Sequence, residues 1–351
     1  MKNLLTSRFH STLRRCALLI ALLLPFAALA DTWQIHVGAQ NGDRAHQALA
    51  FLPNEIWIHA TDSITWSFPT NEVHTVTFLA LGQVRPNRFT GCAGGLPPDG
   101  RTPDFSVFEN NACVNSGVLT NADGKTYTII FPATGNFKLV CLAHPNMTAT
   151  VHVLDLGMPL PHDQAFYDRR ADRQRADLLS DANASAHVHR DDHANADDND
   201  HGNDNNAVVA GTGKIIGTAG GTETASVMRF MDAVKVIHVG ETVEWTTAEA
   251  VTNHTITFGP EPDNQHQIPP SSNVTMDADG GRHAYLSSPS DAVHSGFITE
   301  LPQDRIGLTQ APFNLNSATR FRATFTQPGI YQYKCVLHDE LGMVGAIIVL
   351  P

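Results

Sequence analysis

Two short segments of the chain combine cysteine, histidine and methionine at spacings that suit metal ligation. In each segment a cysteine is followed by a histidine three residues later and then by a methionine, and another histidine lies well upstream. Two imidazoles, one thiolate and a weak axial thioether are acceptable to both Cu(I) and Cu(II). The pattern therefore predicts two copper sites, each suited to one-electron chemistry. The predicted ligands are His74, Cys141, His144 and Met147 in the first site, and His254, Cys335, His338 and Met343 in the second.

Core packing and zinc binding account for these residues less well than copper does. A buried cysteine, a core methionine or a stray histidine is ordinary by itself. Packing alone gives no reason for the whole set to occur twice. Structural zinc usually takes four strong ligands from cysteine and histidine, whereas each of these sets ends in a methionine.

The two ligand sets belong to an internal repeat. The segments Phe51–Trp66 and Phe230–Trp245 have the same internal spacing, since 66 − 51 = 15 and 245 − 230 = 15. The pattern of residues that ends at Cys141 recurs at identical spacing before Cys335. The offset between copies grows from 180 at the ligand histidines to 194 at the cysteines, so the second copy carries an insertion of about 15 residues, which we place within Glu300–Ser317.

Each copy is predicted to be a series of short strands that positions its ligands. Runs rich in β-branched and aromatic residues alternate with clusters of Gly, Pro, Asn and Asp, which predicts an antiparallel sandwich. Side chains two residues apart on a strand share a face. Leu139 should therefore lie on the same face as Cys141, and Tyr333 on the same face as Cys335. Both cysteines are expected to face the core.

Both copies resemble cupredoxins, the group of blue copper proteins that includes plastocyanin, pseudoazurin and amicyanin. The Cys-x-x-His-x-x-Met loop of the first copy is similar to that of amicyanin, and the longer loop of the second resembles those of plastocyanin and pseudoazurin. The Gly-Glu-Thr-Val-Glu-Trp run that ends at Trp245 fits the family as well. The resemblance implies two tandem Greek-key β-sandwich domains of the all-β class, each binding a type 1 copper ion through the ligands named above. The tandem arrangement departs from these mostly single-domain carriers, which leaves the redox partner open.

The other cysteines have different assignments. Cys92 and Cys113 flank a loop rich in Gly, Pro, Asp and Asn, so a disulfide between them is the natural assignment in an oxidising compartment. A disulfide between Cys141 and Cys335 is disfavoured because a histidine follows each of them at ligand spacing.

Residues 1–30 predict a signal peptide. Positively charged residues, including Arg14 and Arg15, precede the apolar run Ala17–Leu24, and cleavage is expected after Ala30. The run is shorter than the roughly 20 residues that span a bilayer, so we expect a periplasmic or secreted protein without a membrane span. The paired arginines leave Sec and twin-arginine export open. A net charge of −12 disfavours nucleic acid and anionic lipid as partners.

The segment between the copies changes in composition. Asp163–Leu179 is expected to form at most a loose helix, and the stretch that follows lacks the apolar content to fold. We therefore predict a flexible linker rich in His and Asp over residues 157–209, between a first domain at 31–156 and a second at 210–351. Its histidines could capture metal, although a solvated tether is the simpler interpretation.

The ligand sets favour electron transfer over catalysis. Each copper would exchange one electron through the partly exposed edge of His144 or His338, with no substrate pocket. Copper oxidases and nitrite reductases need further copper, bound by His-x-His pairs or by a histidine next to the ligand cysteine. No histidine adjoins either cysteine, and the sole His-x-His pair, His187-Val188-His189, lies in the linker. We predict a carrier and no enzymatic activity, with a redox protein such as a cytochrome or a copper enzyme as partner.

The second site lies beside two acidic residues. The pair Asp339-Glu340 next to His338 predicts that this site has the lower reduction potential.

The alternative function for the whole chain is periplasmic copper binding and buffering, which the histidine-rich linker would assist.

Overall fold

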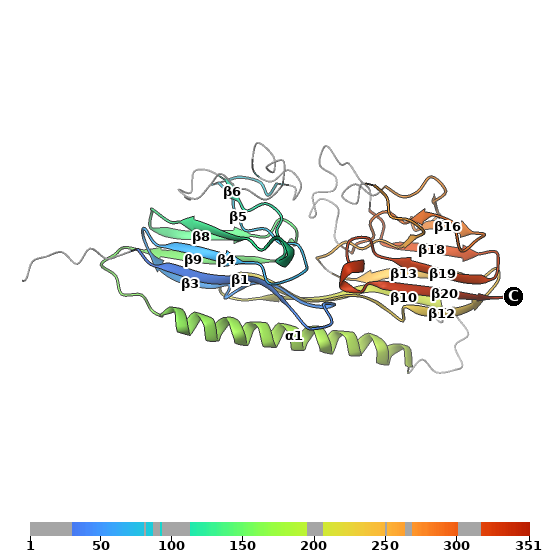
Figure 1. The fold of residues 1–351 in the computed structure, drawn as a ribbon, viewed down its shortest axis with the longest axis horizontal. Coiled ribbons are helices and arrows are strands. Elements are labelled where there is room, and N and C mark those ends of the chain that lie inside the picture. Colours follow the sequence, from blue (N-terminus) through green and yellow to red (C-terminus); the bar gives the residue numbers. More distant parts are fainter. Residues whose placement is uncertain are drawn as a thin grey trace, which may run out of the picture.

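The described part of the computed structural model comprises residues 30–80, 82–86, 92, 113–194, 206–249, 251–263, 269–300 and 317–351. Two β-sandwiches lie side by side, and one long helix runs along both of them (Figure 1). This confirms the predicted all-β fold class. No helix within these residues is long and apolar enough to cross a membrane. The predicted signal peptide lies outside them, apart from Ala30.

The first sandwich packs two sheets against each other. One has the strand order β2-β1-β4-β7 and the other the order β3-β9-β8-β5-β6. β1 runs parallel to β4, and β3 runs parallel to β9, whereas the remaining pairs are antiparallel. The strands are β1 (Thr32–Gln40), β2 (His46–Leu52), β3 (Glu55–His59), β4 (Ser63–Ser67), β5 (Thr77–Phe78), β6 (Val114–Asn115), β7 (Thr126–Ile130), β8 (Gly135–Val140) and β9 (Thr148–Leu154).

The second sandwich repeats this strand order and also contains the hairpin β15–β16. Its sheets have the orders β15-β16-β18-β13-β10-β11 and β12-β20-β19-β14-β17. The hairpin lies beyond β18, the counterpart of β7, and residues 95–106, which correspond to it at the offset of 180, lie outside the described residues. The strands are β10 (Ala207–Gly217), β11 (Thr222–Met231), β12 (Val234–His238), β13 (Thr242–Ala248), β14 (Thr257–Phe258), β15 (Thr275–Met276), β16 (Arg282–Leu286), β17 (Val293–His294), β18 (Arg320–Phe325), β19 (Gly329–Lys334) and β20 (Val344–Leu350).

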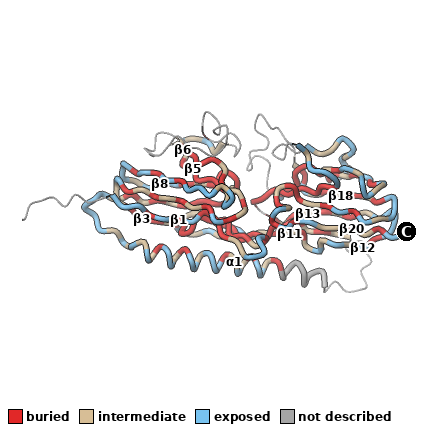
Figure 2. The backbone as a smooth tube through the Cα atoms, in the orientation of Figure 1, coloured by how far each residue is buried: buried red, intermediate tan, exposed pale blue. Residues whose placement is uncertain are grey.

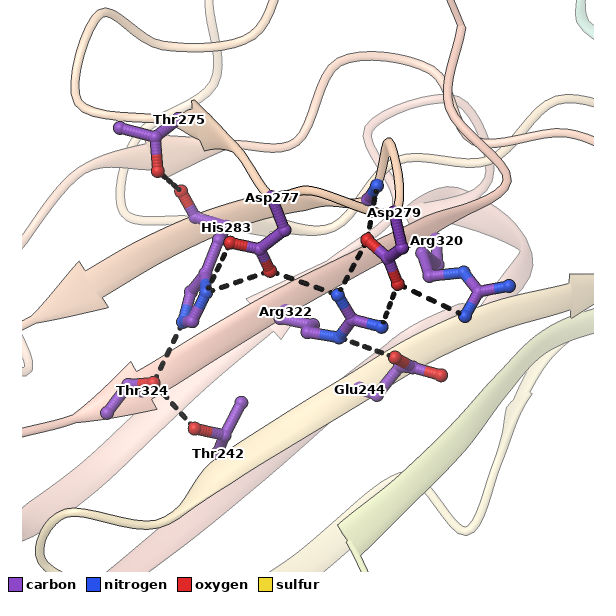
Figure 3. A network of polar contacts seen from close by, with 10 residues as sticks. Thr242, Glu244, Thr275, Asp277, Asp279, His283, Arg320, Arg322 and Thr324 are labelled. Carbon is purple, nitrogen blue, oxygen red and sulfur yellow. Dashed lines mark hydrogen bonds and ion pairs between the residues drawn. The ribbon is translucent and has the colours of Figure 1, made fainter.

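A polar network fastens this hairpin to the sheet (Figure 3). Arg322 on β18 donates to Glu244 of β13 at 2.6 Å and to Asp279 of the hairpin at 2.7 Å. His283 lies 3.1 Å from Asp277, and Arg322 also donates to Asp277 at 3.0 Å. The network is partly exposed, so it orients the hairpin more than it stabilises the domain. The insertion predicted within Glu300–Ser317 falls on residues 301–316, outside the described residues.

Each sandwich encloses an aromatic core. Trp66 packs edge-on against Phe78 with ring centroids 5.9 Å apart, and Trp245 packs against Phe258 at the same distance. All four side chains are buried. Cys141 and Cys335 are also fully buried, together with Leu139 and Tyr333, which confirms that the cysteines face the core. The predicted disulfide between Cys92 and Cys113 is present as well.

The two sandwiches share one continuous sheet. β11 pairs antiparallel with β2, from Thr224 opposite Leu49 to Val227 opposite His46. This pairing joins the two larger sheets into a single sheet of ten strands. Every residue of β2 after His46 is buried, because one face meets the first core and the other is covered by the helix. Residues 48–52 are thus a continuous apolar run without the alternation of a half-exposed strand.

The predicted flexible linker is wrong for residues 164–194. These residues form one α-helix, α1 (Gln164–Ala194), which packs on β1, β2, β10 and β11 (Figures 1 and 2). Its buried positions recur at helical spacing, but most are alanines, so charged residues dominate the composition. They contact small residues of β2 and β11, which allow a close approach. The buried positions of α1 are Tyr167, Ala171, Leu178, Ala182 and Ala186.

Candidate metal centres

The first ligand cluster forms at one end of the first sandwich. His74 precedes β5, where its backbone pairs with Leu119, and Cys141 directly follows β8. The ligand atoms of His74, Cys141 and His144 all lie within 4.8 Å of one another. Cys141 Sγ lies 3.6 Å from His144 Nδ1, and all three side chains are buried.

The second cluster repeats this arrangement. His254 precedes β14 and pairs with Ile298, and Cys335 directly follows β19. The ligand atoms of His254, Cys335 and His338 again lie within 4.8 Å of one another. Cys335 Sγ is 3.4 Å from His338 Nδ1 and 3.8 Å from His254 Nδ1. Two clusters of the same three residue types therefore occupy matching places in the two sandwiches.

The methionines close the ligand loops. The Cys141 amide donates to the Met147 carbonyl at 2.9 Å, and the Cys335 amide donates to the Met343 carbonyl at 3.0 Å. Both methionine side chains are fully buried. Each methionine thus lies directly across its loop from the ligand cysteine, although the two loops differ in length. The second loop fits its extra residues into a short 3₁₀ turn, Asp339–Leu341.

Two threonines that the sequence analysis missed hold the cysteines. The Thr75 amide donates to Cys141 Sγ at 3.4 Å, and the Thr75 hydroxyl accepts from the Leu142 amide at 2.8 Å. Thr255 makes the same two contacts with Cys335 Sγ and the Val336 amide, at 3.4 and 3.0 Å. Hydrogen bonds to a thiolate tune its metal chemistry. The repeated His-Thr pair was the signal that could have identified them.

Two glycines make room for the upstream histidines. Gly38 and Gly211 have φ values of 76° and 75° and lie at irregularities in β1 and β10. A Cβ atom on Gly38 would lie 2.4 Å from Nε2 of His74, and one on Gly211 would lie 2.4 Å from Nε2 of His254. Both the left-handed backbone and the close approach require glycine at these positions.

The upstream histidines have buried ring nitrogens without hydrogen-bond partners among the described residues, as expected of metal ligands. Both nitrogens of His74 and Nε2 of His254 are buried without a hydrogen-bond partner among the described residues. Burying such atoms unpaired is unfavourable. A metal ion within the first cluster would give His74 a partner. The donor set of two imidazoles, one thiolate and one thioether suits copper.

A buried glutamate from the first domain lies between the two clusters. Glu72 Oε1 is 3.2 Å from Nε2 of His144, and its Oε2 is 3.7 Å from Nε2 of His338. Burial alone would raise the pKa of Glu72. The charge of His338 and the hydrogen bond from His144 act in the opposite direction and outweigh burial, so the pKa of Glu72 is lowered to about 2. Burial lowers the pKa of His144, but Cys141 and Glu72 together raise it to about 9. Glu72 is therefore an anion at neutral pH.

The expectation of exposed histidine edges is wrong. His144 and His338 are only 2% and 3% exposed, because each ring faces Glu72 at the junction of the domains. This burial could not be predicted from the sequence, because the alternation of side chains along a strand carries no information about contacts between the two copies. The side chains of the linker residues His187, His189 and His193 lie outside the described residues, as does His201.

Charged side chains support each ligand loop from outside. Arg85 donates to the carbonyls of Pro145 at 2.8 Å and His144 at 3.2 Å, and it also contacts the Cys141 carbonyl. In the second domain Lys334 pairs with Asp339 at 3.1 Å and with Glu261. The negative charge of Asp339 is thus largely offset within its own loop.

A comparison with protein families found a copper-binding family that matches part of the chain. A family model described as copper binding proteins, plastocyanin/azurin family, matches residues 215–350. A search of curated proteins found no match. Among solved structures, the chain is similar to plastocyanin from Dryopteris crassirhizoma, with 19% identity, 41% of this chain and 99% of that chain covered, and a TM-score of 0.21. For amicyanin from Paracoccus versutus the values are 18%, 43%, 86% and 0.22. The family match confirms the resemblance to cupredoxins for the second domain.

Proposed function

We propose that this chain, whose second domain belongs to the plastocyanin/azurin family of copper-binding proteins, is an exported electron carrier with a type 1 copper site in each of two domains. The first domain would comprise residues 31–156 and the second 210–351. The observation that carries the proposal is the pair of matching buried clusters, each with a cysteine, two histidines and a methionine across the loop.

The residues of each cluster have distinct roles in this proposal. His74, Cys141, His144 and Met147 would hold one ion, and His254, Cys335, His338 and Met343 the other. Copper, when bound, supplies a one-electron couple between Cu(I) and Cu(II). The Thr75 and Thr255 amides orient the sulfur atoms, and the packed core excludes water from them. A rigid, preformed ligand set limits the rearrangement that accompanies a change of charge.

The proposal includes no enzymatic activity. Leu142 and Val336 follow the ligand cysteines, and neither can ligate a neighbouring catalytic metal. The expected partners are redox proteins, such as a cytochrome or a copper enzyme. We propose a periplasmic or secreted location on the basis of residues 1–30 and the disulfide between Cys92 and Cys113.

Replacing each ligand cysteine tests this function. The purified protein should bind two copper ions and show a strong visible thiolate-to-copper band. Cys141→Ser and Cys335→Ser should each remove about half of that band, because each deletes one thiolate ligand. Visible absorption, paramagnetic resonance and copper analysis provide the measurements, with Met158→Leu at an exposed methionine as the control.

Three outcomes would contradict the proposal. A protein without the visible band has no type 1 copper, whatever its copper content. Sustained consumption of oxygen or nitrite would indicate an enzyme. Rapid release of copper to a weak chelator would favour copper buffering instead.

A further inference from the structure

The ligand histidines of the two domains face each other across a single carboxylate. In both rings Nδ1 points to the cysteine of its own domain, at 3.6 Å for His144 and 3.4 Å for His338. In both rings Nε2 points the other way, toward Glu72, at 3.2 and 3.7 Å. His144, His338 and Glu72 are all nearly inaccessible to solvent.

This orientation assigns the two nitrogens different tasks. A histidine that binds metal through Nδ1 carries its proton on Nε2, and a carboxylate that accepts this proton's hydrogen bond fixes the ring and raises its basicity. Glu72 Oε1 is within hydrogen-bond distance of His144, whereas Oε2, at 3.7 Å from His338, makes an ion-pair contact with that ring. A single residue therefore occupies, for both clusters, the place that a separate carboxylate or carbonyl usually fills in each metal site.

Close contacts between the two domains keep His144 and His338 on either side of Glu72. Next to the first ligand loop, the Thr222 amide of the second domain donates to Thr148 Oγ1 at 2.9 Å. A Cβ atom on Gly221 would lie 2.4 Å from the Thr148 carbonyl, so the two backbones are in close contact. Together with the pairing of β2 and β11, these contacts fix the distance between His144 and His338.

The matching position in the second copy shows that Glu72 is not a feature of the repeat. The offset of 180 residues at the ligand histidines places Thr252 where the first copy has Glu72. Glu72 is thus a carboxylate of one domain that lies between histidines of both, while the buried Glu249 of the second domain interacts electrostatically with His144.

We propose that Glu72 couples the two metal sites, positioning His144 and His338 together so that the charge state of one site is felt at the other. This inference rests on the proposed function. A carboxyl group enclosed between the two rings, with little solvent to screen it, interacts with a change of charge on either side. Because coupling is reciprocal, a change at either site must alter the other by the same factor.

The test replaces Glu72 with glutamine, which has the same shape but no charge. Loss of a carboxylate partner typically weakens metal binding by roughly 10-fold or more. Glu72→Gln should therefore weaken Co²⁺ binding at both clusters, measured by titrating the metal-free protein and following the thiolate-to-cobalt band. It should also raise the reduction potentials of both copper sites, and more so at the first. Glu241→Gln, at an exposed carboxylate between β12 and β13 and outside both ligand loops, is the matched control and should change neither.

A second experiment measures the coupling directly. Cys141→Ser empties the first site, and the potential of the second site is then compared with that of the full chain. The resulting shift should shrink in the Glu72→Gln background, and Glu72→Asp, which keeps the charge, should preserve most of it. If Glu72→Gln affects one site only, or if the shift is unchanged, the inference is overturned. Absence of the visible band from the unaltered protein would instead remove the proposed function itself.

Discussion

The upstream histidines have almost no room to move. Gly38 and Gly211 bring the backbone against the Nε2 side of each ring, while the cysteine occupies the other side. The rings are therefore fixed by contact with backbone, not by hydrogen bonds, since Nε2 of both is unpaired within the described residues. The orientation of each histidine ring then depends on a glycine that is not itself a predicted metal ligand.

Adding one methyl group should disable a site. Gly38→Ala places Cβ 2.4 Å from His74 Nε2 and adds the roughly 1–2 kcal/mol cost of a left-handed alanine. We expect loss of the first site's share of the visible band, measured in copper-loaded protein. Gly82 has the same φ of 76°, and a Cβ atom there would meet no atom of the described residues within 4 Å, so Gly82→Ala should lose stability without losing colour. Equal bleaching by both variants would contradict the steric argument.

A second buried carboxylate predicts how stability depends on pH. Burial raises the pKa of Glu249 to about 7, although hydrogen bonds from Ser226 and the Val251 amide lower it in part. The folded protein then holds a proton that the unfolded chain releases near pH 4.5. The free energy of unfolding should therefore fall as pH rises from about 4.5 to 7, by at most about 3 kcal/mol from this group.

Glu249→Gln should remove this slope. The measurement is denaturant unfolding of the metal-free variant and parent at pH 5 and pH 7.5. Other titrating groups, among them Glu223, whose pKa burial also raises to about 7, contribute equally to both proteins. If the variant and the parent lose stability in parallel as the pH rises, Glu249 is ionised in the folded state throughout.

The elements differ in how well the sequence predicted them. Strands such as β4 and β13 were predictable because their side chains alternate between a core and solvent, which imposes period two. Helix α1 was predicted only as a loose helix over Asp163–Leu179, and its full length was missed, because its buried face consists mostly of alanine and its partner surface is formed by strands of both domains. The ligand sets could be predicted because their spacing is local, whereas Glu72 acts through a contact between copies that no local pattern encodes.

Helix α1 should contribute to the stability of both domains together. Leu178 is buried against β2 and β11, so Leu178→Ala should lower the free energy of unfolding by roughly 2–5 kcal/mol. Because the helix contacts both sandwiches, we also expect the thermal transition to separate into two steps. Calorimetry measures both effects, and Arg173→Ala on the exposed face is the control. An unchanged single transition would indicate that the helix merely rests on the surface.

At the scale of the whole molecule, the two domains form one continuous body. The ten-stranded sheet, the helix and the Glu72 contact all cross from one sandwich to the other. The histidine edges that a separate domain would present to a partner lie inside this junction. In the proposed function, electron exchange with a partner would therefore use another part of the surface, and the two proposed sites would be neighbours on either side of Glu72.

This arrangement reverses the order of reduction potentials expected from the sequence alone. The acidic residues beside His338 predicted a lower potential at the second site, but Asp339 is paired with Lys334 and Glu340 is exposed to solvent. Glu72 is buried and lies closer to His144, at 3.2 Å, than to His338, at 3.7 Å. A nearby anion favours the more positively charged Cu(II) state, and burial strengthens its effect. We therefore expect the first site to have the lower potential. Redox titration of Cys335→Ser reports the first site and that of Cys141→Ser the second, and a lower value for the second would show that axial geometry outweighs the charge of Glu72.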